Sequence, residues 1–191
     1  MLARLIRPAV SLLILMTFLL GIVYPMLITA ISKAAFPRQA AGSLVYRNGA
    51  LIGSMLIGQS FSDPKYFWGR PSATAPQPYN GLASGASNLG PLNPALIDQV
   101  KANQKALHDA DPENQSPIPV DLVTASASGL DPEISLAAAH YQAQRIARAR
   151  NLPVDAIENL IRAHQEGRLL GLTGERRVNV LTLNLALDAM R

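Results

Sequence analysis

The stretch PAVSLLILMTFLLGIVYPMLITAI, from Pro8 to Ile31, contains no charged side chain and determines how the rest of the chain is interpreted. As a helix, its 24 residues would extend about 36 Å, compared with about 30 Å for the hydrocarbon core of a membrane. Thirteen of them are Leu, Ile, Val or Phe, which favour insertion. We therefore predict one transmembrane helix at residues 8–31, after a short leader at residues 1–7.

A cleaved signal peptide is the alternative interpretation, because Arg4 and Arg7 precede the apolar stretch. The apolar core of a signal peptide is about 7 to 15 residues long and is followed by a cleavage site between small residues. This stretch is longer and carries the bulky Ile28 and Ile31 near its end. A permanent anchor is therefore the favoured interpretation.

The flanking charges give the expected orientation. Arg4 and Arg7 precede the span, and Lys33 and Arg38 follow it. A first span with a short basic leader normally keeps that leader in the cytoplasm. We expect a single-pass protein of the bacterial inner membrane, with residues 1–7 in the cytoplasm and residues 32–191 as a soluble domain in the periplasm or its equivalent. The absence of cysteine is compatible with an oxidising compartment and does not require one.

Two residues inside the predicted span are expected to matter for packing in the membrane. Gly21 permits close approach of a neighbouring helix. Pro25 supplies no N–H and clashes with the preceding turn, so it is expected to kink the helix or to end its regular part.

The net charge of +4 does not indicate nucleic-acid binding. All 13 acidic residues and 14 of the 17 basic residues follow Lys33, so the soluble part carries a net charge of only +1. No basic stripe with interleaved aromatic residues is present. The membrane is therefore an expected partner and nucleic acid is not.

The soluble part is predicted to be a single α+β or α/β domain with a β-hairpin or small sheet and about four helices. The turn Asn48-Gly49 is typical of a tight hairpin, and the aromatic residues that follow it predict an ordered loop. Helix N-termini are expected at Pro94, at Asp131-Pro132, at Pro153 and at Asn179. The expected ranges are strands at residues 43–47, 50–57 and 120–124, a loop at 58–94, and helices at 94–109, at 132–150, from 153 and from 179.

Motifs for catalysis and metal binding are weak. His108, His140 and His164 lie far apart, without a second ligand at a spacing that would form a metal site, so no metal is expected. Ser62 and Lys65 fit the S-x-x-K pattern of penicillin-recognising serine enzymes, but the companion S-D-N and K-T-G motifs are absent. The phosphate-binding G-x-x-x-x-G-K-[ST] loop and the phosphorylated Asp-Lys-Thr-Gly segment are absent as well. No catalytic residue is predicted.

Two segments are rich in small polar residues, at 68–91 and 121–131. One interpretation is turn chemistry, in which Ser, Asn and Asp side chains bond to the nearby backbone. The other is contact with a partner or ligand. The candidate contact residues are Gln59, Trp68, Arg70, Asn80, Ser84, Ser87, Asn88, Asp121, Ser126, Ser128 and Asp131.

These segments carry a specific resemblance that extends over nearly the whole chain. The motifs that carry it are GSMLIGQSF at 53–61, YFWGRPSA at 66–73, Tyr79-Asn80, SGASNLGP at 84–91, PVDLVTASASGLDP at 119–132, RVNVL at 177–181 and NLALD at 184–188. In these motifs the chain resembles the C subunit of the Kdp-type potassium-transporting ATPase, the KdpC family. It departs from the family pattern at Arg176, where proline is expected, and at Glu133, where histidine or asparagine is common.

The resemblance implies an accessory, non-catalytic subunit of an ATP-driven potassium uptake complex, required for assembly and activity. The implied partners are a K⁺-selective channel-like subunit and a P-type subunit that hydrolyses ATP. One description of the family is a catalytic chaperone that raises the ATP affinity of the pump subunit, so ATP is an implied cofactor that is not firmly bound. An extracytoplasmic domain conflicts with direct ATP contact. The alternatives are a membrane-anchored periplasmic serine hydrolase and a ligand-binding module.

Overall fold

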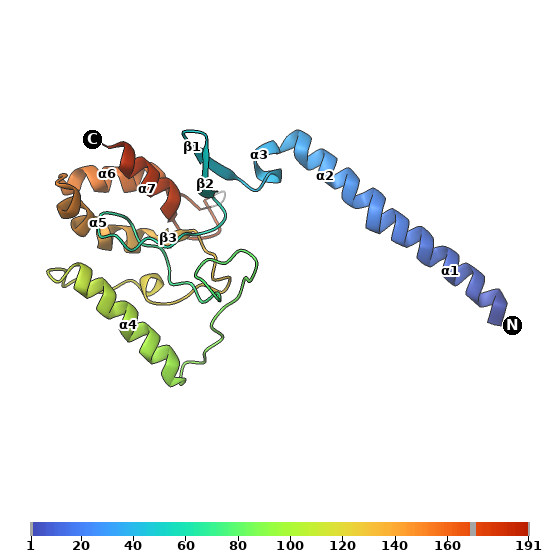
Figure 1. Ribbon diagram of the computed structural model, residues 1–191, viewed down its shortest axis with the longest axis horizontal. Helices are drawn as coiled ribbons and strands as arrows, with labels where there is room; N and C mark the ends of the chain where they lie inside the picture. The colour runs from blue at the N-terminus through green and yellow to red at the C-terminus, as the bar shows by residue number, and fades with distance from the viewer. Residues whose placement is uncertain (1, 169–170, 191) are drawn as a thin grey trace. The chain divides into compact units, whose positions relative to one another are not determined.

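The computed structural model describes residues 2–168 and 171–190, and the chain divides into two units between Leu44 and Val45. The first unit contains one long helical run followed by a single short helix, drawn in blue in Figure 1. Its elements are α1 (Leu2–Phe18), the π-helical turn η1 (Leu19–Val23), α2 (Tyr24–Ala35) and α3 (Pro37–Ala40).

The long helical run contains the predicted membrane span. Residues 4–35 are long and apolar enough to cross a membrane, and none of the most apolar window is buried against the rest of the described chain. A core helix of a soluble protein would be mostly buried, so this helix is not one. The run has its N-terminal end in the chain's first residues and continues past Pro25 to Ala35.

The structure shows how the helix accommodates Pro25. The N–H of Tyr24 bonds to the carbonyl of Leu19, five residues back, which defines a π turn instead of an α turn. In a regular α-helix the ring of Pro25 would clash with the carbonyl of Gly21. A wider turn just before the proline relieves that clash, so the helix is altered locally and does not end.

The second unit begins in a hairpin whose strands are β1 (Leu44–Arg47) and β2 (Ala50–Ser54). Asn48 and Gly49 both have positive φ, at 52° and 79°, as a two-residue type I′ turn requires. The hairpin prediction is confirmed, with the second strand ending at Ser54 and a single bridge from Ser54 to Ile57 beyond it.

A small antiparallel sheet lies at the centre of this unit. Its order is β3-β5-β4, with β3 at Glu133–Ser135, β4 at Gln165–Glu166 and β5 at Arg177–Asn179. Ile134 pairs with Val178, and both are buried among the helices. Helices α5 (Leu136–Arg150), α6 (Val154–His164) and α7 (Val180–Ala189) supply most of the remaining core.

Two boundaries differ from the predictions. Asp131-Pro132 does not begin a helix, because Glu133–Ser135 pairs with β5 and Ser135 caps α5, accepting from the N–H of Ala138 at 3.0 Å. Pairing across the chain therefore outweighs the local capping pattern. Val120 does not begin a strand either, because Val120–Leu122 forms the 3₁₀ turn η2.

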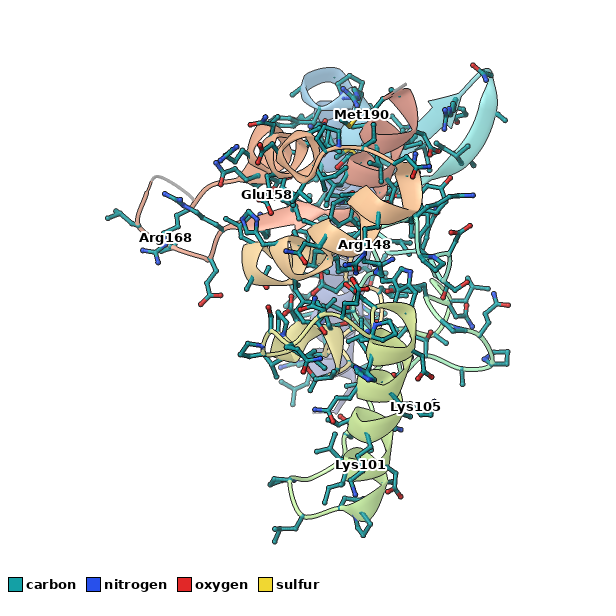
Figure 2. The ribbon with its side chains drawn as sticks, turned by 90° about the vertical axis from the view of Figure 1, so that its left-hand side faces the viewer. Lys101, Lys105, Arg148, Glu158, Arg168 and Met190 are labelled. Carbon is teal, nitrogen blue, oxygen red and sulfur yellow. The ribbon has the colours of Figure 1, made fainter. Side chains whose placement is uncertain are left out.

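Helix α4 (Pro94–Ala110) is capped by Asn93, whose side chain accepts from the N–H of Ala95. It lies apart from α5, α6 and α7 within the second unit, and Lys101 and Lys105 project from the part that extends beyond the other helices (Figures 1 and 2). Among the described residues, α4 to α7 are the helices longer than one turn in this unit, which confirms the α+β prediction of about four helices.

Candidate functional site

Side-chain amides hold the long 58–94 loop on helices α5 and α7. Asn184 accepts from the N–H of Phe67 at 2.8 Å and donates to its carbonyl at 2.9 Å. Gln142 does the same for Trp68, at 2.8 and 3.1 Å. Each amide satisfies one residue's backbone as a neighbouring strand would, and Phe67 is fully buried. The loop is therefore ordered, as predicted.

The guanidinium of Arg145 adds a third attachment. It is buried, donates to the carbonyls of Pro64 and Tyr66 and to Gln142 Oε1, and stacks 4.7 Å from the ring of Trp68. Gln142, Arg145 and Asn184 were not among the residues predicted from the sequence. The sequence feature that could have identified them is a polar residue on the otherwise apolar face of a helix. Such a residue is typically buried and hydrogen-bonded.

The segments at 68–91 and 121–131 come together, and we call them the joined loops. Arg70 connects them, with its guanidinium 3.2 Å from Asp131 Oδ2 and donating to the carbonyl of Ala125 at 3.3 Å. Two hydroxyls add to this: Ser72 donates to the carbonyl of Gly129 at 2.6 Å, and Ser84 donates to that of Ser128 at 3.0 Å. The two segments thus form one surface.

The joined loops approach each other closely at Gly129. Its φ is +66°, and a Cβ there would lie 2.6 Å from Thr74 Cγ2 and 2.7 Å from the carbonyl oxygen of Gly85. Both the conformation and the space require glycine.

Tyr79 holds the 68–91 segment in shape. Its hydroxyl donates to the carbonyl of Arg70 at 2.5 Å. Burial raises the pKa of Tyr79 to about 12, and the nearby Asp131 also raises it. The phenol therefore remains protonated at neutral pH, as a donor must.

Other candidates hold their own segments in shape. Ser126 accepts from the N–H of Gly129 at 3.0 Å, and Ser128 accepts from that of Leu130 at 3.1 Å. Asn80 donates to the carbonyl of Ala75 at 3.0 Å. These bonds are the turn chemistry expected of small polar residues.

Five candidates remain, and two of them lie in the 84–91 stretch. Asn88 is exposed with φ of 51°, and Ser87 lines a cavity of about 270 Å³ beside α4. Three others are directed elsewhere: Gln59 donates to the carbonyl of Ile52 at 2.7 Å, Asp121 accepts from the N–H of Ser135 at 2.8 Å, and Trp68 Nε1 donates to the carbonyl of Asp63 at 3.0 Å.

Two cavities border Arg70. One, of about 300 Å³, is lined by Trp68, Tyr79 and the buried Leu107; the other, of about 500 Å³, adjoins Asp131 and Glu133. Oppositely charged neighbours are paired there, including Arg177 and Glu133 at 2.6 Å.

The geometry argues against the hydrolase alternative. Ser62 is exposed, and Lys65 forms a 3.0 Å ion pair with Asp63. The hydrogen bond with Asp63 raises the pKa of Lys65, whereas a catalytic lysine needs a lowered pKa to accept a proton. Within residues 2–168 and 171–190, no group of three or more His, Asp or Glu side chains is arranged to hold a metal.

Two large apolar side chains that were not predicted as site residues flank the 84–91 stretch of the joined loops in sequence. Leu82 is 99 % exposed and Leu92 is 93 % exposed, on either side of the 84–91 stretch. Exposed leucines are common in folded proteins, so exposure alone does not make these two a contact face.

Comparison with known proteins covers nearly the whole chain. The family described as K⁺-transporting ATPase, c chain, matches residues 6–189. The potassium-transporting ATPase KdpC subunit of Variovorax paradoxus (strain S110) is 63 % identical over 184 residues, covering 96 % of this chain and 95 % of the relative. That of Sorangium cellulosum (strain So ce56) is 61 % identical over 191 residues, covering all of both chains. That of Methylococcus capsulatus (strain ATCC 33009 / NCIMB 11132 / Bath) is 57 % identical over 185 residues, covering 97 % of each.

Proposed function

The chain belongs to the KdpC family, the C subunits of the K⁺-transporting ATPase, and we propose that its folded domain supports the channel-like subunit from outside the cytoplasm. It is a non-catalytic accessory subunit of the Kdp complex, and other Kdp subunits are its partners. Among these we propose two direct partners, the K⁺-selective channel-like subunit and the P-type subunit that hydrolyses ATP.

The observation that carries the location is the charge pattern along an unburied apolar helix. Between Arg7 and Lys33 the helix has no charged residue, and its apolar window is not covered by the rest of the described chain. Arg4 and Arg7 lie within the first turns of that helix. A basic segment before a first span favours the cytoplasmic side, which leaves residues 45–190 on the opposite side.

We propose that the joined loops and their two exposed leucines form the contact face for a Kdp partner. Several of their polar side chains are engaged in internal hydrogen bonds, so the loops are held in shape before any partner binds. Binding then requires little ordering, and Leu82 and Leu92 supply apolar area at the rim.

This location changes how the subunit acts on ATP. A domain outside the cytoplasm does not touch cytoplasmic nucleotide, so any rise in ATP affinity is transmitted through the conformation of the partner subunits. Such a rise in ATP affinity would reflect a coupling free energy between separate sites. It would not require a nucleotide pocket shared by the two subunits.

Reporter fusions after Arg191 test the location. We expect activity from a reporter that folds only outside the cytoplasm, and none from one that works only inside, in cells that express the whole complex. Fusions after Gln39 and after Asn48 serve as controls near the end of the span. Activity from the internal reporter would contradict the proposal and would restore direct nucleotide contact.

A further inference from the structure

The hydrogen-bond ladder of the membrane helix is interrupted at Leu20. In an α-helix the carbonyl of Leu20 accepts from the N–H of Tyr24, but here that N–H bonds to the carbonyl of Leu19. In a π turn the donor to Leu20 is residue 25, which is proline and has no N–H. The carbonyl of Leu20 is therefore left without a backbone donor from its own helix.

The interruption lies where water is least available. Residue 20 is midway in sequence between Arg7 and Lys33, the charged residues that border the apolar stretch. A backbone carbonyl at the middle of a bilayer has no water to bond to and must find a protein donor. Pro8 removes a helix bond as well, but it lies next to Arg7, at the edge of the apolar stretch.

The helix surface near this carbonyl has free space and carries small side chains. A Cβ added at Gly21 would meet only Thr17 Cγ2, at 4.0 Å. Thr17, Gly21, Pro25 and Thr29 recur every four residues. On a plain α-helix such a row drifts by about 40° per step. The π turn contains one extra residue and offsets part of that drift, so these small side chains lie more nearly along one line.

We propose that a transmembrane helix of a Kdp partner subunit packs along this row and donates a side-chain hydrogen bond to the carbonyl of Leu20. The backbone N–H groups of a partner helix are already used within that helix. A charged donor is costly at the middle of the membrane. The donor is therefore a hydroxyl or an amide, such as Ser, Thr, Asn or Gln. This inference rests on the proposed function, in which the chain spans the membrane as one subunit of a complex.

The carbonyl itself provides a direct test. The intact complex in lipid is prepared with carbonyl-¹³C leucine and ¹⁵N glycine in this subunit, so that only Leu-Gly pairs give a signal in solid-state NMR. Such pairs occur at 20–21, 89–90 and 170–171, and the signal that Gly21→Ala removes belongs to Leu20. We expect the Leu20 carbonyl to shift downfield in the complex relative to the subunit alone. An unchanged signal, from a carbonyl bonded by water or left free in both states, would overturn the inference.

Substitution at the row gives a second readout. Gly21→Leu should lower recovery of the partner subunits with this chain at least tenfold while membrane insertion is retained, because the added side chain blocks approach. Ala30→Leu, on the same exposed helix but outside the row, should leave recovery unchanged. Equal recovery for both variants would overturn the inference.

The two tests separate this inference from the proposed function. If the unaltered chain assembles and the external reporter is active, an unshifted Leu20 signal overturns the hydrogen bond alone. If the internal reporter is active instead, the proposed location fails, while a downfield Leu20 signal would still support the contact within the membrane.

Discussion

Arg145 shows how a single buried cation orders the loop that carries the site. It is 4 % exposed, and burial lowers its pKa to about 10, with Asp111 and Asp63 acting in the opposite direction. At neutral pH it therefore remains charged and needs its acceptors. Arg145→Met would leave the carbonyls of Pro64 and Tyr66 without this donor, so we expect a loss of about 2 to 3 kcal/mol in the free energy of unfolding. The measurement is urea unfolding of the full chain in detergent, followed by the fluorescence of Trp68, the single tryptophan.

Matched variants separate geometry from charge at this position. Arg145→Lys keeps the charge but cannot reach several diverging acceptors with one ammonium, so most of the loss should persist. Arg162→Met is the control, since Arg162 is exposed and bonds to Asn159, three residues away in the same helix. That change should stay within about 0.5 kcal/mol. Similar losses for Arg145→Met and Arg162→Met would show that the buried contacts contribute little.

At the same scale, the sequence identifies which residues belong to loops but not which of them bond. Ser72, Ser84 and Ser128 were recognisable as turn formers. Their partners lie 44 to 57 residues away, and no local pattern encodes such a pairing. The sequence therefore predicted that the segments 68–91 and 121–131 are polar. Which hydrogen bonds join them is seen only in the folded structure.

Helices and strands also differ in whether neighbouring residues or long-range pairing determines them. The Asn-Gly hairpin and the Asn179 cap of α7 depend on neighbouring residues and were predictable. Strand β3 was not, because a three-residue strand has no readable period and its partner β5 lies more than 40 residues further on. The local pattern at Asp131-Pro132 favoured a helix there, and pairing with β5 prevailed.

Helix α7 carries an ionic junction that fixes the hairpin and the loop to the core. Asp188 lies 3.1 Å from Arg47 of β1 and 2.8 Å from Arg150 of α5, and it accepts from the Tyr66 hydroxyl at 3.2 Å. Burial by itself raises the pKa of Asp188, but the hydrogen bonds from Arg150, Arg47 and Tyr66 outweigh it and lower the pKa below 3.8.

A pH dependence follows from that lowered pKa. A carboxylate with a depressed folded pKa stabilises the fold above its unfolded pKa of about 3.9, and this contribution is lost as the pH falls through the folded value. Asp188→Asn should therefore melt at a lower temperature than the parent at pH 7, and the difference should shrink as the pH falls below about 4. Thermal unfolding of both chains between pH 7 and pH 3 measures this. Asp98→Asn, at an exposed position of α4, is the control. A difference that stays constant to pH 3 would show that the charge of Asp188 is not its cause.

For the whole molecule, the distribution of charge limits how the domain binds its partners. The residues after Lys33 carry a net charge of only +1, and many of the charged side chains are paired with each other on the surface. Long-range electrostatic attraction is therefore weak, and association of the domain must depend on shape and apolar contact. The anchor compensates for this, because a subunit confined to the same membrane meets its partners at a high effective concentration.

Under those conditions the rim leucines should carry much of the domain's contribution to assembly. The double change Leu82→Asp and Leu92→Asp replaces two almost fully exposed side chains, so folding should be unaffected. Recovery of the partner subunits should fall about tenfold or more, because each aspartate would be desolvated without a partner at the interface. The measurement is co-purification from membranes, with thermal unfolding confirming that the domain is intact. Leu172→Asp is the matched control, since Leu172 is 81 % exposed on a different turn. Equal recovery for the double variant and this control would place the contact face elsewhere on the domain.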